Sequence, residues 1–243
     1  MSDLYTTLAD LYDTVFEWDI ESEADWIVDR LGANCRAVLE PGCGSGRMFA
    51  ALEQRGLAVT GIDLSPEMVA LARARGTNAT VVLADMIDFD LGVFDGAICP
   101  INTLGHLSHR ELATHLDTMS RALVPGARYL VQLAVDSPVG EASRWDVERD
   151  GQHIRATWSV ESRDVNTGVE LHRSVFEVVA GPRAGEVHEQ VHEMSFWTTE
   201  GWSAAVAASP FELRAVYDGS APARPRVDFT ATGGLLWHEL VRP

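Results

Sequence analysis

A glycine-rich turn in the first fifth of the chain constrains the fold more than any other feature. The run 36–40 is short and apolar, which predicts a buried β-strand, and segment 42–46 then places glycine at every second position. Glycines after a first strand let a ligand approach the backbone closely, and a helix expected at about 46–55 presents its positive N-terminus. Arg47 stands where a dinucleotide fingerprint has Gly or Ala, which disfavours a nicotinamide cofactor. A tight turn without a ligand is the alternative.

Strands and helices alternate through residue 135. Further strands are expected at about 57–62, 79–83, 94–99 and 128–135. Further helices are expected at about 20–31, behind the cap Ser65-Pro66, and behind the capping box Ser108-x-x-Glu111, with Pro125-Gly126 ending the last one. This alternation predicts an α/β fold with a Rossmann-like, doubly wound, mostly parallel sheet, whose strand ends share one ligand-binding edge.

The pattern changes after about residue 140. Extended β-branched and aromatic runs at 154–161, 169–179 and 186–197 are separated by turn-forming residues and predict an antiparallel meander. A short helix at about 199–208 and strands at 211–217 and 235–241 then complete the main sheet. We expect a single domain, 1–243, with an N-terminal helical segment 1–34, a ligand-binding core 35–138 and 199–243, and an inserted antiparallel meander 140–198.

The composition excludes several functional classes. The chain has 19 Lys and Arg against 36 Asp and Glu, a net charge of −17, which argues against nucleic-acid binding. It has no lysine, which excludes Schiff-base chemistry, the phosphate-binding loop and Ser-x-x-Lys acyl enzymes. Its three scattered cysteines indicate reduced thiols in a cytoplasmic protein, and we expect neither a signal peptide nor a membrane span.

Carboxylates stand at the ends of the second and third expected strands. Asp63 can accept both hydroxyls of a ribose, and Asp85 can accept from an adenine amino group with Met86 packed on the ring. A single Asp at a strand end is often only a helix cap. Matching residues at three successive strand ends, the glycine turn included, favour a ligand that contains a nucleoside.

With these motifs, segment 36–135 resembles the class I S-adenosylmethionine-dependent methyltransferases. The residues that the resemblance assigns to the methionine part of the cofactor are Glu40, Gly42, Cys43, Gly44 and Gly46. Those that it assigns to the nucleoside part are Asp63, Leu64, Met68, Asp85 and Met86, and Pro100 is a further expected cofactor contact. These motifs are specific for the cofactor and leave the methyl acceptor open.

A narrower resemblance covers nearly the whole chain. Leu11-Tyr12-Asp13, the segment 102–107 and the late meander are similar to N,N-dimethyltransferases of nucleotide-linked amino sugars and related small-molecule enzymes. In that group the meander forms a sheet beside the active site. The segment 135–139 lacks the paired tryptophans of the amino-sugar enzymes, and 236–240 also differs, so the acceptor stays open. The fourth strand ends in Cys-Pro-Ile-Asn, unlike methyltransferases that act on exocyclic amines of nucleic acids.

Several side chains are candidates for the acceptor side. His106 follows the fourth strand and is either a base or orienting donor, or a helix-start histidine bonded to the backbone. Tyr12 either closes over the sulfonium or anchors the N-terminal segment. Asn102 and Trp18 are expected to contact the substrate. Four aromatic residues either stack on the acceptor or fill the contact between the meander and the main sheet: Trp158, Phe176, Phe196 and Trp197.

The segment His188-Glu-Gln-Val-His192 matches the zinc-hydrolase pattern His-Glu-x-x-His. That chemistry requires a helix, which brings both imidazoles onto adjacent turns. Here the segment follows two expected strands, and on a strand residues four apart are about 13 Å apart. We therefore expect no metal site.

The expected function is transfer of a methyl group from S-adenosylmethionine to a small molecule, natural-product or sugar-like, with nitrogen favoured over oxygen. The alternatives are a catalytically silent protein that binds the cofactor, and a zinc hydrolase built on His188, Glu189 and His192. We expect no nucleic-acid or membrane partner, and the sequence leaves open whether the chain is a monomer or a homodimer.

Overall fold

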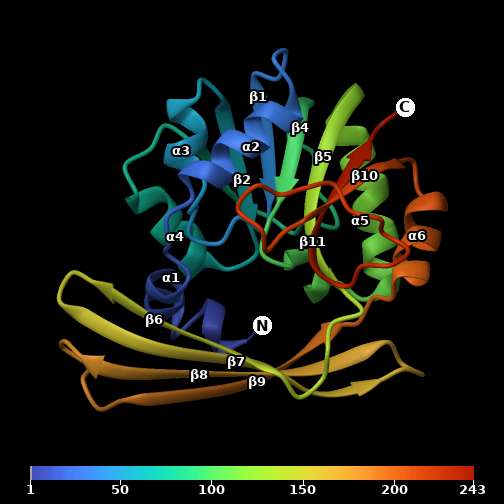
Figure 1. Ribbon diagram of the computed structural model, residues 1–243. Helices are drawn as coiled ribbons and strands as arrows, with labels where there is room; N and C mark the ends of the chain where they lie inside the picture. Colours follow the sequence, from blue (N-terminus) through green and yellow to red (C-terminus); the bar gives the residue numbers. More distant parts are fainter. Residues whose placement is uncertain (1) are drawn as a thin grey trace.

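The computed structural model describes residues 2–243, which form two β-sheets and their covering helices (Figure 1). The helices are η1 (Asp3–Tyr5), α1 (Ala9–Val15), α2 (Glu21–Leu31), α3 (Phe49–Gln54), α4 (Pro66–Ala74), η2 (Thr103–His106), α5 (His109–Ala122) and α6 (Thr199–Ala207). The strands are β1 (Ala37–Pro41), β2 (Ala58–Asp63), β3 (Thr80–Leu83), β4 (Phe94–Cys99), β5 (Leu123–Val135), β6 (Ala142–Arg149), β7 (Gln152–Asp164), β8 (Val169–Ala180), β9 (Val187–Ser195), β10 (Glu212–Asp218) and β11 (Gly234–Val241).

The larger sheet has seven strands in the order β10-β11-β5-β4-β1-β2-β3. Strands β1 to β5 pair in parallel, and only β11 runs antiparallel to its neighbours β5 and β10. The order reverses at β1 and β4, and such a reversal opens a crevice at the carboxyl ends of the strands. The predicted α/β, doubly wound, mostly parallel sheet is confirmed.

Helices cover both faces of this sheet because each presents one apolar stripe. Leu116, Met119 of α5 and Trp202 of α6 lie in the core on one face. Ile27 of α2 and Phe49 of α3 lie in the core on the other. Buried apolar area of this kind is the main stabilising contribution to such a fold. No helix within residues 2–243 is long and apolar enough to cross a membrane.

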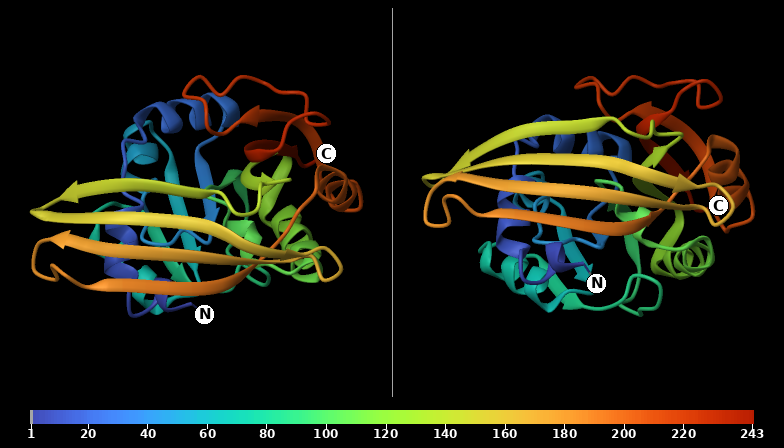
Figure 2. Two further views of the ribbon diagram at one scale, coloured as in Figure 1. Left: turned by 60° about the horizontal axis from the view of Figure 1, so that its bottom comes forward. Right: turned by 90° about the horizontal axis from the view of Figure 1, so that it is seen from below.

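The second sheet is antiparallel, in the order β6-β7-β8-β9, and lies across the carboxyl ends of the parallel strands (Figures 1 and 2). Its inner face packs on α1, with Leu11 and Val15 against Ile154 and Phe176. Trp145 of β6 also donates from its indole N–H to the carbonyl of Val15, at 3.0 Å. The N-terminal helices therefore pack against the second sheet and hold it in place over the first sheet.

The structure differs from the sequence-based expectation in several elements. Helix α5 ends at Ala122 and β5 begins at Leu123, so Pro125-Gly126 lies inside the strand and does not end the helix. Strand β6 was not predicted, and α1 is a separate short helix within the expected N-terminal helical segment 1–34. Helix α3 begins at Phe49, three residues later than expected.

Candidate functional site

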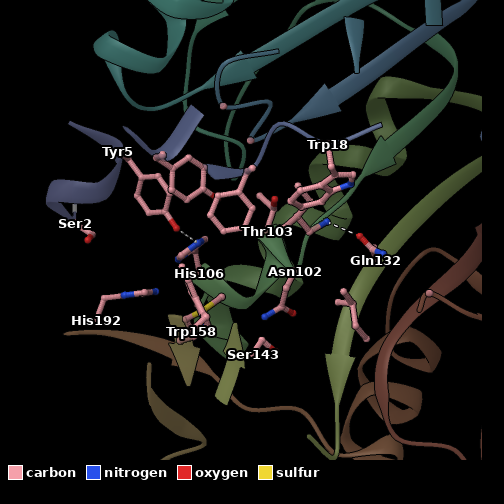
Figure 3. A pocket seen from close by; sticks show the side chains of 18 of the residues that line it. Ser2, Tyr5, Trp18, Asn102, Thr103, His106, Gln132, Ser143, Trp158 and His192 are labelled. Carbon is pink, nitrogen blue, oxygen red and sulfur yellow. Dashed lines mark hydrogen bonds between the residues drawn. The ribbon is translucent and has the colours of Figure 1, made fainter. Parts of the chain in front are cut away.

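A cavity of about 1720 Å³ lies between the ends of the parallel strands and the inner face of the second sheet (Figure 3). Its lining comes from the glycine turn, the ends of β2, β3 and β4, the N-terminal segment and strands β6, β7 and β9. A pocket for a single drug-sized ligand usually has a volume of about 300–1,000 Å³. The cavity therefore has room for two ligands side by side.

The glycine turn lets the backbone form one wall of this cavity. Gly42 and Gly44 line the cavity with positive φ angles of 66° and 54°, which residues with a side chain rarely adopt. A Cβ at Gly42 would clash with Cγ2 of Thr103. The Gly44 N–H donates to Asp63 Oδ2 at 2.8 Å, so the end of β2 fixes the turn.

Two buried charged groups beside this turn lack partners. Glu40 is 2% exposed, and its Oε2 accepts no hydrogen bond from the described residues. Burial raises the pKa of Glu40 to about 8, although Arg47 opposes the shift. Among the described residues, both terminal nitrogens of Arg47 also lack hydrogen-bond partners, although one of them lies 3.5 Å from Glu23 Oε2. The Arg47 guanidinium stacks on Trp18, 4.5 Å from the ring centroid.

The nucleoside candidates Asp63, Leu64, Asp85 and Met86 all line the cavity. Asp63 accepts from two backbone N–H groups through different oxygens, which fixes its plane. Burial raises its pKa, and those backbone donors oppose the shift. Asp85 Oδ1 accepts from the Ile87 N–H at 3.0 Å, and this hydrogen bond leaves the other carboxylate oxygen available to a ligand. The two carboxylates therefore lie at adjacent strand ends, where both can accept hydrogen bonds from a ligand.

Five predicted cofactor contacts lie behind the cavity wall instead of on it. They are Glu40, Cys43, Gly46, Met68 and Pro100, none of which is among the lining residues within 2–243. Cys43 is buried against Gly61, and a Cβ on Gly46 would lie 2.5 Å from the Phe49 ring. These residues shape the turn through packing.

The turn after β4 adopts an unusual backbone conformation. Ile101 and Asn102 both have positive φ, 53° and 55°, and this is uncommon for a β-branched residue such as isoleucine. Gln132 of β5 supports the turn, because its Oε1 accepts from the Ile101 N–H at 2.8 Å (Figure 3). Asn102 Oδ1 accepts from the Ala134 N–H at 2.9 Å. The strained turn delivers Asn102 and His106 to the cavity.

His106 lies opposite aromatic residues of the N-terminal segment. Its Nε2 is 2.9 Å from the Tyr5 hydroxyl (Figure 3). The Tyr5 ring packs edge-on against Tyr12, which stacks on Phe16 at 4.3 Å. The His106 ring is open to the cavity, but the surrounding walls and His172 lower its pKa to about 4. Burial raises the pKa of Tyr12 to about 12, so both groups are uncharged at neutral pH.

Sequence reasoning missed Tyr5 and His192 as site residues. His192 lies on β9, opposite His172 of β8, and its ring centroid is 6.0 Å from that of His106. Neither ring nitrogen of His192 has a hydrogen-bond partner among the described residues, and burial lowers its pKa to about 4. The His-Glu-x-x-His segment is extended as predicted, and its other histidine, His188, bonds to Glu186.

Trp158 of β7 lies at the cavity and donates its indole N–H to His172 at 2.9 Å (Figure 3). Trp18 and Asn102 line the cavity as expected, from the N-terminal segment and the β4 turn. Five of the candidates thus meet at the cavity, whereas Phe176, Phe196 and Trp197 are not among its described lining residues, and Phe176 and Trp197 are buried in the core instead.

The cofactor expected from the sequence fits the glycine-turn half of this cavity. The unpartnered Glu40 oxygen and Arg47 nitrogens match the ammonium and carboxylate of a methionine moiety in charge. Two glycines leave space beside them, and two strand-end carboxylates follow for a nucleoside.

Comparisons with known proteins agree with this reading. Residues 38–126 match the methyltransferase domain family. A dTDP-3-amino-3,6-dideoxy-alpha-D-glucopyranose N,N-dimethyltransferase of Streptomyces fradiae is 28% identical over 83% of this chain and 82% of its own length.

Two solved structures share the fold over almost the full length. An amino pentose methyltransferase of Micromonospora echinaspora, solved with S-adenosylmethionine, superposes with a TM-score of 0.77 at 23% identity, covering 98% of this chain and 97% of the other. A sugar N-methyltransferase of Streptoalloteichus superposes with a TM-score of 0.75 at 25% identity, covering 96% and 92%. Residues 38–126 thus match a methyltransferase domain, and together with the motifs and the site these similarities support an S-adenosylmethionine-dependent methyltransferase that resembles class I.

Proposed function

We propose that this methyltransferase acts on an amine nitrogen of a small acceptor molecule, such as an amino sugar. The observation that carries the proposal is the weak basicity of the imidazoles facing the acceptor side. His106 and His192 both have a pKa of about 4. Methylation of an alcohol or phenol needs a base with a pKa near the working pH, whereas a neutral amine attacks without one.

The cofactor supplies a methyl group on a sulfonium, which is an excellent leaving group. The chain's own task is to hold both ligands in line and to exclude water. In this proposal Glu40, Arg47 and the glycine turn would hold the methionine end of the cofactor. Asp63 would hold its ribose, and Asp85 with Met86 would hold its adenine. Tyr12 then faces the sulfonium with an uncharged ring.

The acceptor nitrogen lies on the other side of the methyl group in this proposal. Asn102 and His106 orient it from the β4 turn, and Trp18 and Trp158 provide apolar walls. The nitrogen lone pair forms the new N–C bond while the S–C bond breaks, and the N–H proton then leaves to water. The three cysteines of the protein are free thiols in the structure, and free thiols agree with a cytoplasmic location.

Matched pairs of acceptors test the proposal. We expect 3-amino-3-deoxy-D-glucose to accept one or two methyl groups, because the amine can attack unaided, and D-glucose to accept none. Mass spectrometry of the products after incubation with deuterated-methyl cofactor makes the measurement. Equal methylation of the two sugars would overturn the proposal, since it would require a base that the imidazoles do not provide.

A further inference from the structure

The charges that line the cavity are strongly one-sided. Among the described residues of the lining, ten are carboxylates and one is an arginine, Arg224. That guanidinium is partly engaged, because it lies 4.0 Å from a Glu23 oxygen and 5.9 Å from the centre of the Trp26 ring, while its Nε has no hydrogen-bond partner among the described residues. It also donates to two backbone carbonyls. Asp63 and Asp85 belong to the cofactor half, so eight carboxylates remain for the rest of the cavity.

The inner wall around the acceptor position is uncharged. Asn102, Ser143 and Trp158 offer amide, hydroxyl and indole groups (Figure 3). His106 and His192 are neutral at physiological pH, since each has a pKa of about 4. Such groups exchange hydrogen bonds with hydroxyls and neutral amines, and they provide no charge to balance an anion.

The rim of the cavity is acidic. Asp19, Asp146, Glu148 and Glu193 line it and are exposed to solvent. Exposed carboxylates of one sign raise the local concentration of cations and lower that of anions. Helix α2 also begins at this rim, but its first turn carries Glu21 and Glu23, which neutralise its positive end.

Several arginines around the cavity are occupied by carboxylates, including Arg155, which lies 3.5 Å from Asp146 of the rim. Arg149 lies 3.3 Å from Glu17, and Arg75 lies 2.8 Å from the same side chain. Arg163 pairs with Glu170, which lies on the same buried face of β8 as Phe176. A diphosphate carries at least two negative charges, and proteins bind it with arginine, lysine or free helix N-termini. The chain contains no lysine at all.

We propose that the acceptor is a free hydroxyl-bearing amine without phosphate groups, drawn in as a cation by the acidic rim and bound by the uncharged inner wall. This inference rests on the proposed N-methylation and narrows its substrate class. It separates the chain from the Streptomyces fradiae relative, which is named for a dTDP-linked amino sugar.

Calorimetry with thymidine 5′-diphosphate tests the exclusion of phosphates. The protein is first saturated with S-adenosylhomocysteine, which blocks the cofactor half, and the titration is run at low salt, where electrostatic binding is strongest. We expect no saturable heat up to millimolar nucleotide. Saturable binding in the micromolar range would overturn the inference and leave N-methylation standing.

The rim is tested with 3-amino-3-deoxy-D-glucose as methyl acceptor. We expect kcat/KM to fall as salt rises, and a Glu148→Gln/Glu193→Gln variant to lower it a few-fold at low salt and flatten that dependence. Glu212→Gln, an exposed carboxylate on β10 outside the cavity, is the matched control and keeps the wild-type profile. A salt-independent kcat/KM in the wild type contradicts the acidic-rim inference. A methyl group found on oxygen instead overturns the proposed function itself.

Discussion

Several single residues in the site are held in states that water does not favour. Glu40 is buried with its pKa raised to about 8, so it is largely protonated at pH 7 without ligand. His106 is neutral well below pH 6, and Ile101 has a left-handed backbone. Residues in such states concentrate at functional sites, where the surrounding fold supports them.

Glu40 should release its proton when the cofactor product binds. The ammonium of S-adenosylhomocysteine favours the ionised carboxylate, so binding near pH 7 releases close to one proton. Calorimetric titration in buffers of different ionisation enthalpy measures that number. Glu40→Gln should remove the proton release and weaken binding, whereas Glu212→Gln should change neither. Proton-independent binding by the wild type would show that Glu40 does not meet the ligand.

The same residue makes a prediction about stability. Its pKa is higher in the folded chain than in the unfolded chain, so its contribution to stability is fully present below about pH 4.5 and is lost as the pH rises to about 8. Without ligand, Glu40→Gln should therefore gain Tm relative to wild type as pH increases from 5 to 8. A difference in Tm that does not change with pH would contradict the assigned shift.

His106 is expected to position the acceptor and not to act as a base. His106→Ala should raise the acceptor KM about tenfold, which corresponds to one lost hydrogen bond of about 1–1.5 kcal/mol, and leave kcat nearly unchanged. Because the His106 pKa is about 4, the variant should keep the wild-type pH profile between pH 6 and 9.

His188→Ala changes a histidine of β9 that bonds to Glu186 outside the cavity lining, and it provides the control for this variant. Steady-state kinetics over that pH range supply the measurement. A large fall in kcat, with a change in the shape of the pH profile, would instead assign His106 as a base.

Sequence reasoning located Asp63 and Asp85 because strand ends in a parallel sheet are adjacent by topology. It missed Tyr5 and His192 for a tertiary reason. Tyr5 reaches His106 across 101 residues, and His192 enters the cavity through the register of β8 and β9. Local sequence patterns indicate neither of these two long-range contacts.

Elements with strong local signals were predicted closely, and those that depend on packing were not. The capping box of α5 and the Ser65 cap of α4 are present as expected. Strand β6 is an edge strand with few buried side chains, so its apolar alternation is weak. Helix α1 has seven residues and no side-chain cap, and its packing on the second sheet stabilises it.

A single substitution at Gln132 removes a hydrogen bond that supports the β4 turn. Gln132→Met removes the acceptor of the Ile101 N–H and should destabilise the fold by about 1–3 kcal/mol. The acceptor kcat/KM should fall further than the affinity for S-adenosylhomocysteine, because the turn carries Asn102 and His106. Thermal unfolding, ligand calorimetry and kinetics together measure this.

Two further variants separate the turn from general stability. Gln132→Glu keeps an acceptor oxygen and should restore part of the acceptor kinetics. Leu130→Ala opens the core lower on the same strand and should reduce stability while sparing the acceptor KM. Equal effects of Gln132→Met and Leu130→Ala on that KM would contradict a role for the turn.

At the scale of the whole molecule, the two sheets divide the work. The larger sheet provides the glycine turn and strand-end carboxylates. The second sheet covers the cavity with uncharged side chains such as Ser143 and Trp158, and its strands β6 and β9 add carboxylates at the rim. The net charge of −17 is concentrated partly around the opening, which favours entry of a cation. The sequence indicated the glycine turn and the carboxylates through their motifs, and it indicated the second sheet through its extended runs. Which side chains of the second sheet face the cavity depends on the register of β6 to β9, which the sequence does not reveal.

The most direct test of the account follows the methyl group itself. The protein is incubated with 13C-methyl S-adenosylmethionine and 3-amino-3-deoxy-D-glucose, and NMR of the product shows which atom bears the labelled carbon. We expect the label on the amine nitrogen and one S-adenosylhomocysteine formed for each methyl group transferred, and we expect Asp63→Ala to lose most of this activity. A label on a hydroxyl oxygen, or S-adenosylhomocysteine formed without a methylated amine, would contradict it.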